Sequence, residues 1–151
     1  MPSFLSTIQK SPDPTYPPPM TENFSHKGYD FGKITDRILK CAVEVHKELG
    51  PFYLETTYQT ALAFELQTEG LEFDRECNVD VHYKWKKVDK RRIDFLVEDV
   101  LVEVKAKAKL EDVDKMQTLS YLKTTGIRVG LLINFGGKTI EVKRLEWNPE
   151  R

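Results

Sequence analysis

Residues 93–105 read IDFLVEDVLVEVK, and this stretch decides the fold. Apolar residues recur at every second position on both sides of Glu98-Asp99, at 93, 95 and 97 and again at 100, 102 and 104, which is typical of two strands joined by a short turn. A two-residue loop at Glu98-Asp99 would set Asp94 opposite Glu103, with their Cβ atoms about 4.5–5.5 Å apart. The sequence therefore predicts a β-hairpin that presents two carboxylates on one face.

Lys105 lies two residues beyond Glu103 and shares its face, because side chains alternate along a strand. Opposed carboxylates repel each other, and a divalent cation removes that conflict. Mg²⁺ binds one or two carboxylates together with waters and phosphate oxygens, and it activates a water for attack on a phosphodiester. Lys105 could orient or deprotonate that water. Glu-x-Lys alone is also a common surface pattern, so the opposing Asp94 is what favours catalysis.

On both sides of this hairpin the hydrophobic period changes between helical and strand-like. Two helical segments and a strand precede the hairpin, and a helix and two strands follow it. The expected bounds are 33–49 and 54–69 for the first two helices, 79–83 for the preceding strand with a turn near Lys86-Lys87, 112–125 for the third helix, and 127–133 and 139–145 for the last two strands.

This order of elements predicts an α/β fold. A strand, a helix and a strand in succession form a right-handed crossover, which makes strands 100–105 and 127–133 parallel. The expectation is a three-layer sandwich with a mixed central sheet between helices. Residues 31–151 would form this domain, and residues 1–30, rich in proline, would form a disordered tail. A partner-binding proline motif is the alternative for the tail.

Composition excludes several classes of protein. The formal net charge of -1 gives no global attraction to nucleic acid, so a binding surface must be local. No apolar run approaches the roughly 18 residues of a membrane span, and no secretory signal is evident. Cys41 and Cys77 have neither zinc nor disulfide spacing. We expect a cytoplasmic protein without a membrane partner.

Ile93-Asp94 followed by Glu103-Val104-Lys105 resembles the PD-(D/E)-x-K phosphodiesterase superfamily, and the chain resembles its GxxExxY family more closely. The resemblance covers about residues 33–145. The segments that carry it, besides the hairpin, are Glu44-Val45-His46-Lys47-Glu48-Leu49-Gly50-Pro51, Leu54-Glu55-Thr56-Thr57-Tyr58, Gln117 with Tyr121-Leu122-Lys123, and Gly130-Leu131-Leu132-Ile133-Asn134-Phe135.

The resemblance implies a restriction-endonuclease-like core and a nuclease that uses Mg²⁺ or Mn²⁺. It implies catalytic roles for Asp94, Glu103, Lys105 and Gln117, and it adds Glu55 to Asp94 and Glu103 as a metal ligand. Tyr58 and Tyr121 lie one turn from Glu55 and Gln117, and core packing is the simpler interpretation of both tyrosines. The sequence departs from the family at Phe52, where the signature glycine stands, and at Ile93, where the superfamily is named for a proline.

A local basic patch surrounds Tyr83 and Trp85. It could hold phosphates, and a solvated hairpin tip is the other interpretation. The residues assigned to nucleic acid are Lys84, Lys86, Lys87, Arg91, Arg92 and Lys107.

Two functional hypotheses follow. The first is a metal-dependent nuclease that acts on nucleic acid, with DNA favoured over RNA. The second is a catalytically silent module with the same fold, which binds nucleic acid or a partner protein. A homodimer is open under both hypotheses.

Overall fold

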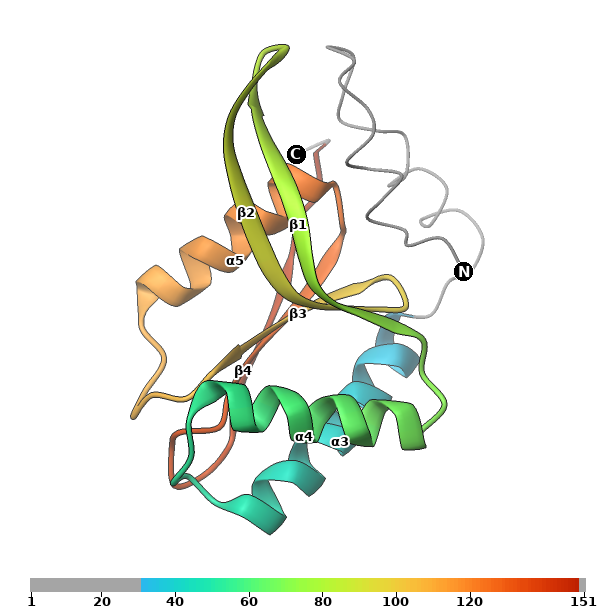
Figure 1. The fold of residues 1–151 in the computed structure, drawn as a ribbon, viewed down its shortest axis with the longest axis vertical. Coiled ribbons are helices and arrows are strands. Elements are labelled where there is room, and N and C mark those ends of the chain that lie inside the picture. Colours follow the sequence, from blue (N-terminus) through green and yellow to red (C-terminus); the bar gives the residue numbers. More distant parts are fainter. Residues whose placement is uncertain (1–30, 150–151) are drawn as a thin grey trace.

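The computed structural model describes residues 31–149, in which three helices surround one five-stranded sheet (Figure 1). The elements are α3 (Phe31–Leu49), α4 (Glu55–Thr68), β1 (Phe73–Tyr83), β2 (Lys86–Val97), β3 (Val100–Lys105), α5 (Asp112–Thr125), β4 (Val129–Asn134) and β5 (Glu141–Glu146). The tail expected over residues 1–30 lies outside the described residues. None of the helices between residues 31 and 149 is long and apolar enough to cross a membrane.

The sheet has the order β1-β2-β3-β4-β5 and is mixed, as predicted. β3 occupies its centre, antiparallel to β2 and parallel to β4, and α5 forms the crossover between β3 and β4. The predicted hairpin is confirmed, because Val97 pairs with Val100 across a turn at Glu98-Asp99.

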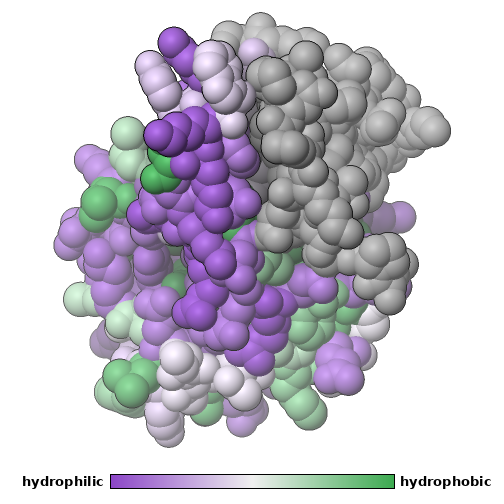
Figure 2. All heavy atoms as spheres, turned by 45° about the horizontal axis from the view of Figure 1, so that its top comes forward, coloured by the Kyte–Doolittle hydropathy of each residue, from purple (hydrophilic) through white to green (hydrophobic). Residues whose placement is uncertain are grey.

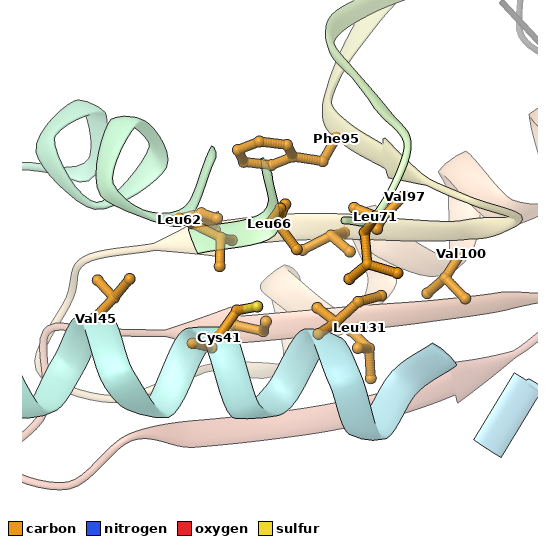
Figure 3. Packing of buried hydrophobic residues seen from close by; sticks show 14 of the residues in the cluster. Cys41, Val45, Leu62, Leu66, Leu71, Phe95, Val97, Val100 and Leu131 are labelled. Atoms are coloured by element: carbon orange, nitrogen blue, oxygen red, sulfur yellow. The ribbon is translucent and has the colours of Figure 1, made fainter. Parts of the chain in front are cut away.

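Alternation along β3 directs its side chains into two separate apolar layers. Val100, Val102 and Val104 pack with α3 and α4, whereas Leu101 packs with Leu122 of α5. Figure 3 shows the first layer, in which apolar side chains of α3 and α4 meet those of the sheet. The three-layer α/β sandwich is therefore confirmed. All six residues of β4 are buried, as expected for a strand covered on both faces.

Two predicted boundaries in the first half of the sheet are wrong. β1 begins at Phe73, and its turn with β2 lies at Lys84-Trp85 instead of Lys86-Lys87. Tyr83 pairs with Lys86, and Lys84 takes a positive φ of 55° to close the turn. The polar residues 74–76 hide the start of β1, and at the other end the ribbon extends beyond the core, so the apolar alternation that marks a buried strand is absent around the turn.

The loop after β3 is held against the turn after β4. Asn134 is buried, and its side chain accepts a hydrogen bond from the Lys107 N–H (3.0 Å) and donates one to the Lys107 carbonyl (2.8 Å). A Cβ atom at Gly136 would lie 2.4 Å from the backbone N and O of Lys107. This corner needs glycine, and it fixes the path of the chain that leaves Lys105.

Candidate active site

Asp94 and Glu103 stand where the ladder between β2 and β3 ends. Phe95 and Val102 are the last paired residues on this side of the turn. Beyond them, the Asp94 carboxylate accepts a hydrogen bond from the Val104 N–H (2.8 Å), and the Glu103 carboxylate accepts one from the Asp94 N–H (3.3 Å). The two carboxylates lie near each other, as predicted, but they replace backbone pairing at this point instead of projecting from a continuous ladder.

Glu103 is a buried carboxyl group, with 4% of its surface exposed. Burial holds the pKa of Glu103 well above its ordinary value, and the charge and side-chain hydrogen bond of Asp94 raise this pKa further, while the Asp94 backbone N–H and the charge of Lys105 lower it. Within residues 31–149 neither Glu103 nor Asp94 forms an ion pair with a lysine or arginine. The pair therefore brings two carboxyl groups together, and no lysine or arginine in this part of the chain balances their charge through an ion pair.

Lys105 and Gln117 meet across the space between β3 and α5. The Lys105 ammonium donates a hydrogen bond to the Gln117 side-chain carbonyl at 3.1 Å. Lys105 is half-buried at the end of β3, and Gln117 is half-buried on α5. The structure thus brings together two residues that are 12 positions apart and that the sequence assigned to one site.

Glu55 is the first residue of α4, and it belongs to the same electrostatic environment. Burial raises the pKa of Glu55, the charge of Asp94 raises it further, and the charge of Lys105 lowers it. Within residues 31–149, however, no three histidine, cysteine, aspartate or glutamate side chains lie close enough together to hold a metal ion. The predicted ligands Glu55, Asp94 and Glu103 are neighbours, but they do not form a closed cluster.

Tyr58 positions the chain that leads into Glu55. Its buried hydroxyl donates a hydrogen bond to the Gly50 carbonyl and accepts one from the Tyr53 N–H (3.2 Å). Its ring stacks on Phe135, with centroids 4.9 Å apart. Phe52, the departure from the family pattern, is 85% exposed and leaves this arrangement intact. Tyr58 is therefore a core residue that supports the site, as the simpler interpretation expected.

Asp114 is a site neighbour that sequence reasoning missed. It is buried, with 6% of its surface exposed, and it accepts hydrogen bonds from the Glu111 N–H (2.8 Å) and the Lys107 ammonium (2.9 Å). Burial raises the pKa of Asp114, but these two donors and the charges of Lys107 and Lys105 outweigh that effect and lower it overall. Glu111 and Asp114 form a capping box at the start of α5. The Glu-x-x-Asp spacing of this capping box is the sequence feature from which the position of Asp114 could have been predicted.

Lys107 is consequently occupied within the protein. Its ammonium forms ion pairs with Asp114 (2.9 Å) and Glu111 (3.6 Å). Its assignment to nucleic acid stays a prediction, and it lies apart from the other residues of the set, which stand on the β1–β2 hairpin. His46, on α3, forms a hydrogen bond through Nε2 with the Gly137 carbonyl (3.0 Å).

A pocket of about 600 Å³ lies elsewhere and is lined by residues of α3 and α4. Its lining comes from residues 44–49 and 56–65 and includes none of the predicted site residues. Apolar groups form most of its lining, and its acidic residues are Glu44, Glu48 and Glu65. The chemistry of Asp94 and Glu103 therefore belongs to the sheet and not to this pocket.

Comparison with known proteins gives one match to a family and one to a solved structure. Residues 32–145 match the family described as the PD-(D/E)XK nuclease superfamily. The chain is also similar to the crystal structure of SSO0001, with 16% identity and a TM-score of 0.48, over 96% of this chain and 78% of that one. No curated protein matches the sequence.

Proposed function

The chain belongs to the PD-(D/E)XK nuclease superfamily, and we propose that it is a metal-dependent nuclease that hydrolyses phosphodiester bonds, with DNA as its preferred substrate. The observation that carries the proposal is the Asp94–Glu103 pair. A buried carboxyl beside a second one is unfavourable for a purely structural sheet, and Lys105 stands on the same strand. We further propose that the chain is a member of the GxxExxY family, on the basis of the motifs named above.

The three carboxylates do not form a closed cluster within residues 31–149, but the chemistry of their donor atoms fits Mg²⁺ or Mn²⁺. Asp94, Glu103 and Glu55 supply only carboxylate oxygens, which are the ligands these hard cations prefer. Glu103 is buried with one hydrogen-bond donor at 3.3 Å, so a cation would satisfy it better than the protein does. When bound, the ion would polarise a phosphoryl oxygen and lower the pKa of a water.

Lys105 supplies the positive charge that acts beside the carboxylates. Its partner at 3.1 Å is the neutral Gln117 amide, and within residues 31–149 it forms no ion pair. Its positive charge therefore remains available to orient a water or to stabilise charge that develops on the phosphate. Gln117 positions the ammonium, and the Asn134–Gly136 corner positions the backbone that follows it.

The test is cleavage of plasmid DNA, single-stranded DNA and RNA with Mn²⁺ or Mg²⁺. Asp94→Asn and Lys105→Met should each lower the rate by about 100-fold or more, since each removes a group that acts on the reacting phosphate. Asp112→Asn and Lys143→Met are matched controls, because both side chains are exposed outside the site. Undiminished cleavage by both site variants would show that the assignment is wrong.

The second hypothesis, a catalytically silent module, is favoured by one observation. The exposed basic hairpin between β1 and β2 needs no metal to bind phosphates. The two hypotheses separate in a single experiment. Nucleic acid bound without metal, and no cleavage by the unmodified chain at any Mn²⁺ or Mg²⁺ concentration, would support the silent module.

A further inference from the structure

The hairpin of β1 and β2 extends beyond the body of the molecule as an arm, defined here as residues 83–92 (Figure 1). All ten of these residues are exposed. A two-stranded ribbon that buries neither face gains little stability from packing. The arm therefore contributes little to the core, and its composition reflects another requirement.

The arm is strongly basic within a chain whose formal net charge is -1. Its only acid is Asp89, and its basic residues are Lys84, Lys86, Lys87, Lys90, Arg91 and Arg92. Lys87 pairs with Asp80 (3.2 Å) and Arg91 with Asp89 (3.7 Å). The other four form no ion pair with a carboxylate of residues 31–149. Figure 2 turns this end forward and shows a broad band of hydrophilic side chains over it.

The tip of the arm combines these charges with two exposed aromatic rings. Tyr83 is 66% exposed and Trp85 is 69% exposed. Lys84 and Trp85 form a two-residue turn with positive φ at Lys84, where asparagine, aspartate or glycine is normally found. The turn thus accepts a strained lysine and an exposed tryptophan, and turn stability does not explain this choice.

We propose that the arm binds unpaired nucleotides of the substrate, with Trp85 stacking on a base while Lys84, Lys86 and their basic neighbours contact the phosphates. The inference rests on the proposed function only in that the substrate is nucleic acid. Aromatic side chains stack on any base whose face is accessible, and neighbouring lysines and arginines follow the backbone. A base inside a duplex offers no such face, so single strands are preferred.

The arm also sets a distance from the reacting phosphate. Asp94 lies on β2, nine residues after Trp85, which corresponds to at most about 30 Å of extended strand. For a strand that runs straight along the arm, with the duplex spacing of roughly 3.4 Å per nucleotide as the shortest rise, the stacked base lies about nine nucleotides or fewer from the cut. The preferred substrate therefore carries an unpaired segment within that reach.

Tryptophan fluorescence tests this directly. The sequence has two tryptophans, Trp85 and Trp147, and Trp147 is half-buried against the α5 layer. In a Trp147→Phe chain, Trp85 is the single reporter. We expect saturable quenching by a 15-residue oligo-dT in EDTA, and weaker binding to a duplex of equal length. No quenching, or tighter binding to the duplex, would overturn the proposal.

A turn exchange removes the ligand-binding groups without weakening the hairpin. The double variant Lys84→Asn/Trp85→Gly, made in the Trp147→Phe chain and followed by fluorescence anisotropy of labelled oligo-dT, installs a favoured turn. We expect it to fold and to bind about tenfold more weakly or worse. Lys138→Asn, in the β4–β5 turn, is the matched control and should bind normally. Unchanged affinity of the turn variant would contradict the proposal.

Two further measurements complete the test. If the turn variant does not fold, Lys90→Gln/Arg92→Gln replaces it and should also weaken binding by about tenfold or more, since two phosphate contacts are lost. Binding in EDTA is independent of cleavage. If the unmodified chain binds oligo-dT but cleaves nothing, the proposed nuclease activity is wrong and the proposal for the arm stands. If it cleaves nucleic acid but does not bind oligo-dT, the proposal for the arm is wrong and the nuclease activity stands. Dimers in sedimentation that disappear in the turn variant would assign the arm to self-association and overturn the proposal.

Discussion

At the scale of single residues, Glu103 presents a conflict between folding and function. Its carboxyl is buried beside Asp94 and receives one N–H donor at 3.3 Å. Ionisation in that position removes the group from water with little compensation from the protein. Metal-free protein should therefore gain stability when this charge is deleted, even though the nuclease would lose a ligand.

We predict that Glu103→Gln stabilises the metal-free protein at neutral pH, by on the order of 1 kcal/mol. Because the pKa of Glu103 is raised in the folded state, the folded chain binds its proton more tightly than the unfolded chain does. The stability that protonated Glu103 contributes is fully present below the pKa of the unfolded chain, and it is lost as pH rises through the pKa of the folded chain. Urea unfolding in EDTA at pH 5 and pH 8 should show the advantage of the variant growing with pH. A variant less stable than the parent at pH 8 would contradict this account.

Tyr58 is a second residue at which structure and site meet. We predict that Tyr58→Phe destabilises the fold by about 0.5–1.5 kcal/mol, because the hydroxyl bonds to Gly50 and Tyr53 are lost while the ring stack on Phe135 remains. Cleavage should fall in addition, since these bonds hold the segment that leads into Glu55. Thermal unfolding and initial rates measure the two effects.

Tyr121→Phe is the control for Tyr58. The Tyr121 hydroxyl has a weaker contact, with the exposed Arg91 guanidinium at 3.5 Å. The variant should unfold close to the parent temperature. If both phenylalanine variants behaved alike, the hydroxyl of Tyr58 would have no special role in positioning α4.

At the scale of elements, the loop after β3 depends on one close backbone approach. We predict that Gly136→Ala destabilises the protein by about 1–3 kcal/mol and lowers cleavage, because its Cβ would meet the Lys107 backbone at 2.4 Å and displace the chain beyond Lys105. Gly70→Ala is the matched control. Gly70 also resists substitution, with a φ of +80°, but nothing lies within 4 Å of its Cβ position.

The comparison of the two alanine variants separates steric displacement from backbone strain. Gly70→Ala should lower stability without changing cleavage per folded molecule. Gly136→Ala should change both, as measured by urea unfolding and by rates at saturating metal. Full activity in Gly136→Ala would show that this corner does not position Lys105.

The same scale shows what sequence can and cannot predict. The apolar residues on both sides of Glu98-Asp99 predict the hairpin, although both faces of β3 prove to be buried, and helical spacing from Ile34 to Leu49 predicts α3. The sequence does not predict that the pairing of β2 with β3 ends at Phe95 and Val102. Strand separation there depends on the rest of the sheet, so no local pattern encodes it. Asp114 escaped notice because its burial arises from packing of α5, although its capping spacing was visible.

For the molecule as a whole, metal binding should appear as a gain in stability. We predict that Mn²⁺ raises the melting temperature of the unmodified chain, because a ligand that binds only the folded state adds about 2.7 kcal/mol at 100 times its Kd. Glu103→Gln should lose most of this gain, and Asp112→Asn should keep it. An equal response to Mn²⁺ in Glu103→Gln would place the metal elsewhere.

The overall charge distribution matters at the same scale. The chain has a formal net charge of -1, yet the arm is basic, so the remainder is acidic. Attraction to nucleic acid is thus concentrated at the arm, whereas the rest of the chain carries a net negative charge. This asymmetry could not be derived from net charge alone. It required the finding that β1 and β2 continue past the core.

The burial of Glu103 finally separates what folding requires from what chemistry requires. If the metal-free chain gains stability when Glu103 is replaced, as predicted above, folding does not explain why a carboxyl stands at this position. The proposed nuclease activity does explain it, because Asp94 and Lys105 stand beside Glu103 and all three would act on one phosphate. The stability measurement therefore also bears on the choice between the proposed nuclease and the silent module.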